Sequence, residues 1–148
     1  MMKTLMTAMM TSTSEVMETM FYLPVEFQNE PAVLNGLDNF TPHTACELKF
    51  SGDVSGRVTL VIPKDLLSEM TENFMGESRD NLKEEHLFGT LTETLNMICG
   101  NALSRVDSKI PFELDIPDMI DALKLPGTRL FSLIKTTQSM MAMTISLD

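Results

Sequence analysis

KEEHLFGTLTETLNMICGNALSRV, residues 83–106, is the stretch that most constrains the fold. Its apolar residues recur at steps of three and four, the spacing of one face of an α-helix. The stripe consists of Leu87, Leu91, Leu95, Ile98, Ala102 and Val106. The pattern predicts one long amphipathic helix over 83–106 with this stripe buried.

The opposite face of this predicted helix carries polar and small residues. At roughly 100° per residue, with Leu91 at zero, Glu93 falls at about 200° and Asn96 at about 140°. Side chains three residues apart on a helix are neighbours, so the two can act on one small target. Gly89 and Gly100 share this face, although glycine inside a helix costs about 1 kcal/mol relative to alanine. Either a partner approaches the helix backbone closely here, or Glu93 and Asn96 are simply solvated.

Strand patterns lie on both sides of the long helix. Upstream, alternating apolar runs at 46–50 and 58–62 flank a turn-rich segment with Gly52 and Gly56, which predicts a β-hairpin. A shorter helix is expected over 64–75, ended by Gly76. Downstream, strands are expected at 112–116, 129–136 and 141–147.

The N-terminal part repeats this organisation more weakly. A helix is expected over 12–22 and ended by Pro24, followed by a turn-rich connection over 28–42. Residues 1–11 are expected to be irregular. The chain is therefore predicted to be one α+β domain, residues 1–148, in which a helix plus antiparallel strands occurs twice about a pseudo-two-fold axis.

Composition excludes several classes of function. With 21 acidic and 11 basic residues in 148, the formal charge is −10, which disfavours nucleic acid and anionic membranes as partners. We find no apolar run long enough to span a bilayer. Cys46 and Cys99 fit neither a disulfide framework nor a zinc site, which favours buried thiols in the cytoplasm. His43 and His86 lack ligand or triad partners in sequence, so we expect no metal site and no cofactor bound by this chain.

The segment LTETLNMICGNALSRV, residues 91–106, resembles the signature of the CheX/CheC family of chemotaxis phosphatases, in which Glu-x-x-Asn precedes an Ile-x-Gly-Asn-Ala stretch. The resemblance extends back through Met75 and Gly76 to the preceding helix. The family pattern also has Asp or Ser where this chain has Gly89, and a later Pro that Pro117 matches only in a shifted register.

This resemblance implies a phosphatase that hydrolyses the aspartyl phosphate of a CheY-type response regulator. Glu93 would engage a lysine of the regulator and Asn96 would position the attacking water, while Mg²⁺ would be bound by the regulator. Gly89, Met97, Gly100 and Pro117 are the implied partner contacts. The resemblance also implies a homodimer joined through sheet edges, which the final strands could supply.

The first helix keeps only part of the pattern. Ser14 and Glu18 match it, but Phe21 stands where the Asn is required, so one site is expected, as in CheX-like members. Phe21 is either a buried core residue or an exposed contact beside Tyr22. The alternative to catalysis is a non-catalytic module for regulator docking or dimerisation in a chemosensory or flagellar-switch system.

Overall fold

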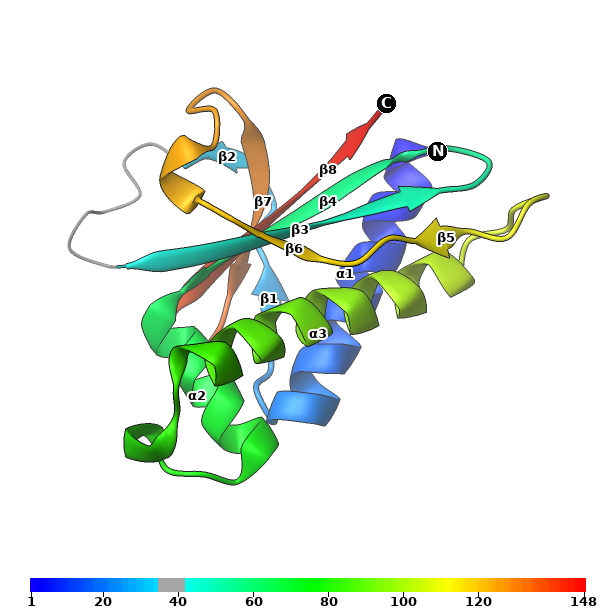
Figure 1. The fold of residues 1–148 in the computed structure, drawn as a ribbon. Coiled ribbons are helices and arrows are strands. Elements are labelled where there is room, and N and C mark those ends of the chain that lie inside the picture. Colours follow the sequence, from blue (N-terminus) through cyan, green and yellow to red (C-terminus); the bar gives the residue numbers. More distant parts are fainter. Residues whose placement is uncertain (35–41) are drawn as a thin grey trace.

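The computed structural model describes residues 1–34 and 42–148. It is an α+β fold in which helices cover one face of an antiparallel eight-stranded sheet (Figure 1). The helices are α1 (Met2–Phe21), α2 (Lys64–Met75) and α3 (Glu84–Ser104), with short 3₁₀ helices η1 (Arg79–Asn81) and η2 (Ala122–Lys124). The strands are β1 (Glu26–Phe27), β2 (Ala32–Val33), β3 (His43–Ser51), β4 (Gly56–Pro63), β5 (Glu113–Leu114), β6 (Asp118–Ile120), β7 (Leu130–Lys135) and β8 (Met140–Leu147).

The prediction for the first residues is wrong. Residues 1–11 were expected to be irregular, but α1 begins at Met2 and forms one helix of 20 residues. Leu5 and Met9 are fully buried in the core, so packing against the rest of the molecule stabilises a segment that lacks a side-chain cap at its start. The end of α1 is as expected, because the chain leaves the helix at Tyr22, whose φ of 58° is left-handed.

The predicted hairpin, the two later helices and the later strands are all confirmed. The prediction of a turn-rich segment over 28–42 is tested only in part, because residues 35–41 lie outside the described residues. Gly76 ends α2 with φ 67°, a conformation in which a side chain would be strained. Strand β2, which lies inside the 28–42 segment, and the three-residue strand β6 were not predicted.

The pairing of the strands makes the duplication visible. The long hairpins β3–β4 and β7–β8 meet at the centre of the sheet, where β4 pairs antiparallel with β8. β1 and β2 of the first half pair with β7 of the second half, and β5 and β6 of the second half pair with β3 of the first. Each half therefore completes the sheet of the other, as a pseudo-two-fold arrangement requires.

This topology corrects one expectation about dimers. The sequence left open that the final strands could supply free sheet edges, but β8 pairs on both sides, with β4 and β7. The edges are instead formed by the short strands β1 and β2 at one end and β5 and β6 at the other.

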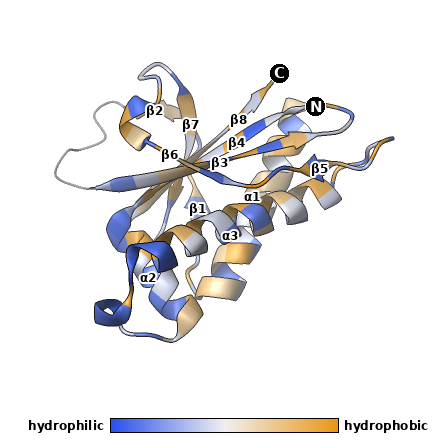
Figure 2. Cartoon of the chain, in the orientation of Figure 1, coloured by the Kyte–Doolittle hydropathy of each residue, from blue (hydrophilic) through white to orange (hydrophobic). Residues whose placement is uncertain are grey.

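The main core lies between the helices and the sheet, and Figure 2 shows apolar residues distributed along the helices and the central strands that enclose it. The alternating residues 46, 48 and 50 of β3 and 58, 60 and 62 of β4 point into it. A smaller apolar cluster around Phe131 covers part of the other face. Cys46 and Cys99 are free and buried as predicted, and burial raises the pKa of the Cys99 thiol to about 12.

Candidate functional site on helix α3

Helix α3 is oriented by its apolar stripe. All six predicted residues of the stripe are buried, and Leu91, Leu95, Ile98 and Ala102 have no exposed surface. At the start of the helix, the backbone N–H of Lys83 donates a hydrogen bond to Nδ1 of His86 at 2.9 Å. Glu84 and Glu85 lie in the first turn, where their negative charges interact favourably with the positive end of the helix dipole. His86 thus has a structural role in beginning the helix.

The outer face of α3 carries the predicted pair. Glu93 and Asn96 are both exposed, one turn apart, at the middle of a helix of 21 residues. Neither side chain makes a hydrogen bond or an ion pair with any other described residue. The carboxylate and the amide are therefore available to a partner, held on a rigid element and pointing away from the core.

The two glycines flank this pair and are also exposed. A Cβ atom built on Gly89 meets no atom within 4 Å, and one built on Gly100 meets only Cδ1 of Leu114 at 3.8 Å, an ordinary contact. Nothing in the described fold therefore requires glycine at either position. This strengthens the interpretation that an outside partner requires the bare helix backbone.

The other two predicted contacts, Met97 and Pro117, are only partly exposed. Met97 packs against the main core, and Pro117 lies between β5 and β6 on the sheet edge. A partner at the outer face of α3 could contact only the exposed parts of these two side chains. Their role as contacts stays a prediction.

A polar network that the sequence did not reveal joins α1 to α3. Asn101 Oδ1 accepts hydrogen bonds from Ser12 Oγ at 2.9 Å and from Arg105 Nε at 2.8 Å. Arg105 Nη2 donates in turn to Glu15 Oε2 at 2.6 Å. The motif residue Asn101 thus fixes how the helix that carries Glu93 and Asn96 lies against α1.

The equivalent face of α1 has no such pair. Glu18 is exposed as expected, but Phe21 is 1% exposed and its ring lies 5.9 Å from the ring of Phe74. This confirms the buried alternative for Phe21. The Phe21 carbonyl also accepts a hydrogen bond from Asn73 Nδ2 at 2.7 Å. The position in α1 that corresponds to Asn96 is therefore occupied by a core residue and offers no side-chain amide to a partner.

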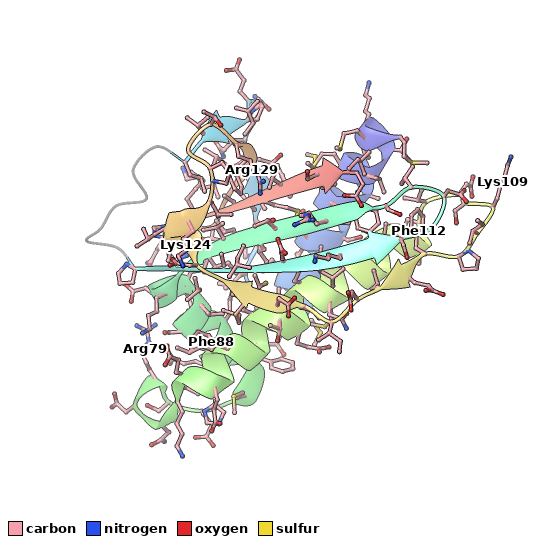
Figure 3. All side chains as sticks on the ribbon, turned by 45° about the horizontal axis from the view of Figure 1, so that its top comes forward. Arg79, Phe88, Lys109, Phe112, Lys124 and Arg129 are labelled. Carbon is pink, nitrogen blue, oxygen red and sulfur yellow. The ribbon has the colours of Figure 1, made fainter. Side chains whose placement is uncertain are left out.

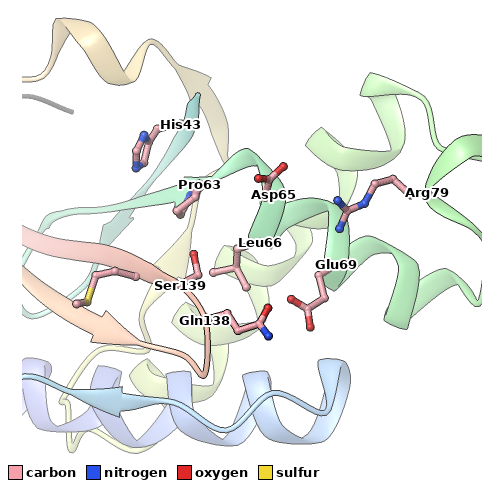
Figure 4. A pocket seen from close by; sticks show the side chains of 9 residues that line it. His43, Pro63, Asp65, Leu66, Glu69, Arg79, Gln138 and Ser139 are labelled. Carbon is pink, nitrogen blue, oxygen red and sulfur yellow. The ribbon is translucent and has the colours of Figure 1, made fainter. Parts of the chain in front are cut away.

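The site is a convex helix face and not a cavity. A cavity of about 540 Å³ lies elsewhere, between the start of α2 and the β7–β8 turn, where Asp65, Glu69, Arg79 and Gln138 are among its lining residues (Figure 4). It contains none of the predicted site residues. An exposed helix face suits a macromolecular partner better than a small molecule, which usually binds in a concave pocket.

Among residues 1–34 and 42–148, no group of three or more His, Cys, Asp or Glu side chains is placed to hold a metal ion. Within the same ranges, we find no helix whose length and apolar character would let it cross a membrane.

The fold has well-matched solved relatives. The chemotaxis protein CheX from Vibrio vulnificus is 19% identical, with 97% of this chain and 96% of that chain covered and a TM-score of 0.77. The CheX–CheY–BeF₃–Mg²⁺ complex from Borrelia burgdorferi matches at 15% identity, with 96% of each chain covered and a TM-score of 0.70. FliY from Thermotoga maritima matches at 13% identity over 95% of this chain and 84% of that chain, with a TM-score of 0.61.

These likenesses define the class of fold as that of CheX- and CheC-like proteins. The sequence gives the family directly, because residues 44–128 match the model of "Chemotaxis phosphatase CheX". The matched region is more than half of the chain and includes the whole of α3. The protein belongs to the CheX family. A search among curated proteins finds no match.

Proposed function

We propose that this protein is a phosphatase that hydrolyses the aspartyl phosphate of a CheY-type response regulator. The observation that carries the proposal is the exposed pair Glu93 and Asn96 on α3, which make no hydrogen bond or ion pair with the rest of the described chain. Membership of the CheX family and the fold shared with a CheX in complex with CheY support it.

Hydrolysis of an aspartyl phosphate requires little covalent catalysis from the protein. Phosphoryl transfer is accelerated mainly by positioning the attacking group and by organising charge around the phosphoryl oxygens. In the proposed complex, the amide of Asn96 orients a water molecule in line with the aspartyl phosphate. An uncharged amide can do this without repelling the anionic phosphoryl group, which a carboxylate at the same position would repel.

Glu93 acts beside it as the docking group. Its carboxylate lies one helical turn from Asn96, and we propose that it engages a lysine of the regulator next to the phosphorylated aspartate. Mg²⁺ enters the site bound to the regulator; Mg²⁺ and BeF₃ are both components of the CheX–CheY complex from Borrelia burgdorferi. This division leaves the chain to supply two side chains and a rigid helix.

The experiment compares two matched glutamates. The decay of a phosphorylated CheY-type regulator is followed with the unchanged protein, with Glu93→Ala and with Glu18→Ala. Both residues are exposed on the pseudo-equivalent helices α3 and α1, but only Glu93 has a neighbouring amide. We expect Glu93→Ala to lose about tenfold or more of the acceleration and Glu18→Ala to keep it. Equal activity of the two variants would contradict the assignment of the site to α3.

A non-catalytic docking module is the second candidate. Two observations favour it: Gly89 stands where the family pattern has Asp or Ser, and FliY, another protein of this fold, is a structural neighbour. This candidate predicts tight binding of the phosphorylated regulator without faster decay. Binding and decay measured on the same sample separate the two.

The proposal also includes a cytoplasmic homodimer, as the family resemblance implies. The short edge β1–β2 is the surface through which the sheets of two copies could join. Light scattering should give twice the mass of one chain, and a mass near 16.6 kDa would remove the dimer from the proposal.

A further inference from the structure

The sheet edge beside α3 contains a β-bulge. Along β3, two residues separate Glu47, which pairs with Asp118, from Phe50, which pairs with Leu114. Along the edge strand, three residues separate Leu114 from Asp118. The edge strand therefore has one extra residue at 115–117, and bulges of this kind redirect a side chain at sheet edges and beside active sites.

The local sequence Asp115-Ile116-Pro117 builds this bulge. The N–H of Asp115 donates the last regular hydrogen bond to β3 before the bulge, to the Lys49 carbonyl at 2.9 Å. The N–H of Ile116 bonds instead to Oδ1 of Asp115 at 2.8 Å, and Pro117 has no N–H to satisfy. The N–H groups of the bulge thus need no further partner, and the Ile116 side chain is turned out to 80% exposure.

The edge strand that contains the bulge follows α3. At one end of the edge strand, Leu114 lies beside Gly100, where a built Cβ would be 3.8 Å from Leu114 Cδ1. At the other end, Met119 pairs with Cys46, whose Sγ lies 3.9 Å from the Leu91 carbonyl oxygen. The segment therefore runs antiparallel to α3 from position 100 towards position 91, beside the helix as Figure 1 shows. Ile116 and Pro117 fall between these ends, next to the middle turn of α3.

We propose that Ile116 is a specificity-determining contact for the response regulator that docks on the Glu93–Asn96 face; this inference rests on the proposed function. A regulator that presents its phosphoryl group to Asn96 must cover the neighbouring surface, and the bulge places a rigid β-branched side chain there. Burial of such a side chain in the complex supplies affinity, and the shape of the regulator's complementary surface decides which regulator fits.

The partner that covers Ile116 is a folded regulator and not a β-strand added to the sheet edge. Pro117 and the bulge interrupt the row of free backbone groups that a pairing strand would need, which is a common way of blocking a sheet edge. Ile116 therefore acts through its side chain. A second copy of this chain that covers Ile116 is the competing occupant, and the experiment below distinguishes the two.

Residues 107–117, here called the arm, also contain a matched control. Ile110 is also exposed, at 59%. It directly follows Lys109, which Figure 3 shows at the tip of the arm, away from the middle of α3. Its N–H is bonded to the Asp53 carboxylate at 3.0 Å, and neither this bond nor that of Ile116 involves the isoleucine side chain. Serine at either position therefore keeps the backbone bonds of the arm.

The test measures the affinity for a CheY-type regulator loaded with beryllium trifluoride and Mg²⁺, a stable mimic of the phosphorylated form. We expect Ile116→Ser to weaken binding about tenfold or more, because the loss of a buried aliphatic side chain has an effect of that size. Ile116→Val should keep most of the affinity, and Ile110→Ser should change it less than twofold. The sedimentation behaviour of the free protein should be the same for all variants.

Three results would overturn the proposal. These are unchanged regulator affinity of Ile116→Ser, equal losses in the Ile116 and Ile110 variants, and a change in the oligomeric state of Ile116→Ser that accounts for its loss of binding. Because the readout is binding, it is separate from catalysis. A protein that binds through Ile116 without hydrolysing phosphate would leave this inference standing while the phosphatase proposal fails.

Discussion

At the scale of single residues, the outer face of α3 combines two features that the fold itself does not explain. The side chains of Glu93 and Asn96 have no hydrogen-bond or ion-pair partner among the described residues, and Gly89 and Gly100 have room for a side chain that they lack. A helix selected only for stability would carry alanine in place of both glycines. The combination is what a helix needs when a partner must reach its backbone and two polar side chains together.

Substitution of Gly100 separates stability from function. Gly100→Ala should raise the free energy of unfolding by about 0.5–1 kcal/mol, since alanine favours the helix and its Cβ would make only an ordinary contact with Leu114. The same methyl group should weaken binding of the phosphorylated regulator. Urea denaturation and a binding titration check the two effects.

Gly89→Ala is the companion variant, because its Cβ would meet no atom within 4 Å. If both variants are more stable and bind the regulator as tightly as the unchanged protein, the glycines are not contacts. Opposite shifts in stability and affinity are the expected result.

At the scale of elements, α3 is positioned by α1 as well as by the sheet. Asn101 Oδ1 accepts from the buried Ser12 hydroxyl and from Arg105. A buried donor left without its acceptor costs about 1–3 kcal/mol. Asn101→Ala should therefore lower the free energy of unfolding by an amount in this range, measured by chemical denaturation.

Ser12→Ala provides the control for that variant. If the bond between Ser12 and Asn101 is the main loss, the double variant should be less destabilised than the sum of the two single variants. Strictly additive effects, or no effect of Asn101→Ala, would show that the network does not hold the two helices together.

The elements also show which parts of the fold a single sequence can predict. The helix over 83–106 and the hairpin around Gly52 and Gly56 carry strong periodic patterns, and both were predicted. The start of α1 was missed because its Met- and Thr-rich sequence has weak amphipathic and capping signals, and tertiary packing decides its conformation. The strand β6 was missed because three residues are too few to show a period.

The candidate site was predictable to a similar degree. The angular positions of Glu93 and Asn96 follow from helix geometry alone, and the structure places both on the exposed face. The contributions of Ser12 and Ile116 depend on contacts between segments far apart in the sequence. An isoleucine next to a proline carries no sign that a bulge will expose it beside α3.

At the scale of the whole molecule, the duplication gives two related helix faces, of which only that of α3 exposes an amide next to a glutamate. The two halves exchange their short strands across the sheet, so α1 and α3 occupy related places. In α1, Phe21 is drawn into the core against Phe74, whereas α3 keeps Asn96 exposed. The fold thus supports one helix face that can act on a partner and one that packs as structure.

The most direct test of this account is the rate at which saturating amounts of the protein dephosphorylate a CheY-type regulator, with the unchanged protein and with Asn96→Ala. We predict that the maximal rate falls about a hundredfold, as expected when a positioning group is removed, while binding of the beryllium trifluoride-loaded regulator is retained. A maximal rate that is unchanged in Asn96→Ala would contradict the central claim that this amide positions the attacking water.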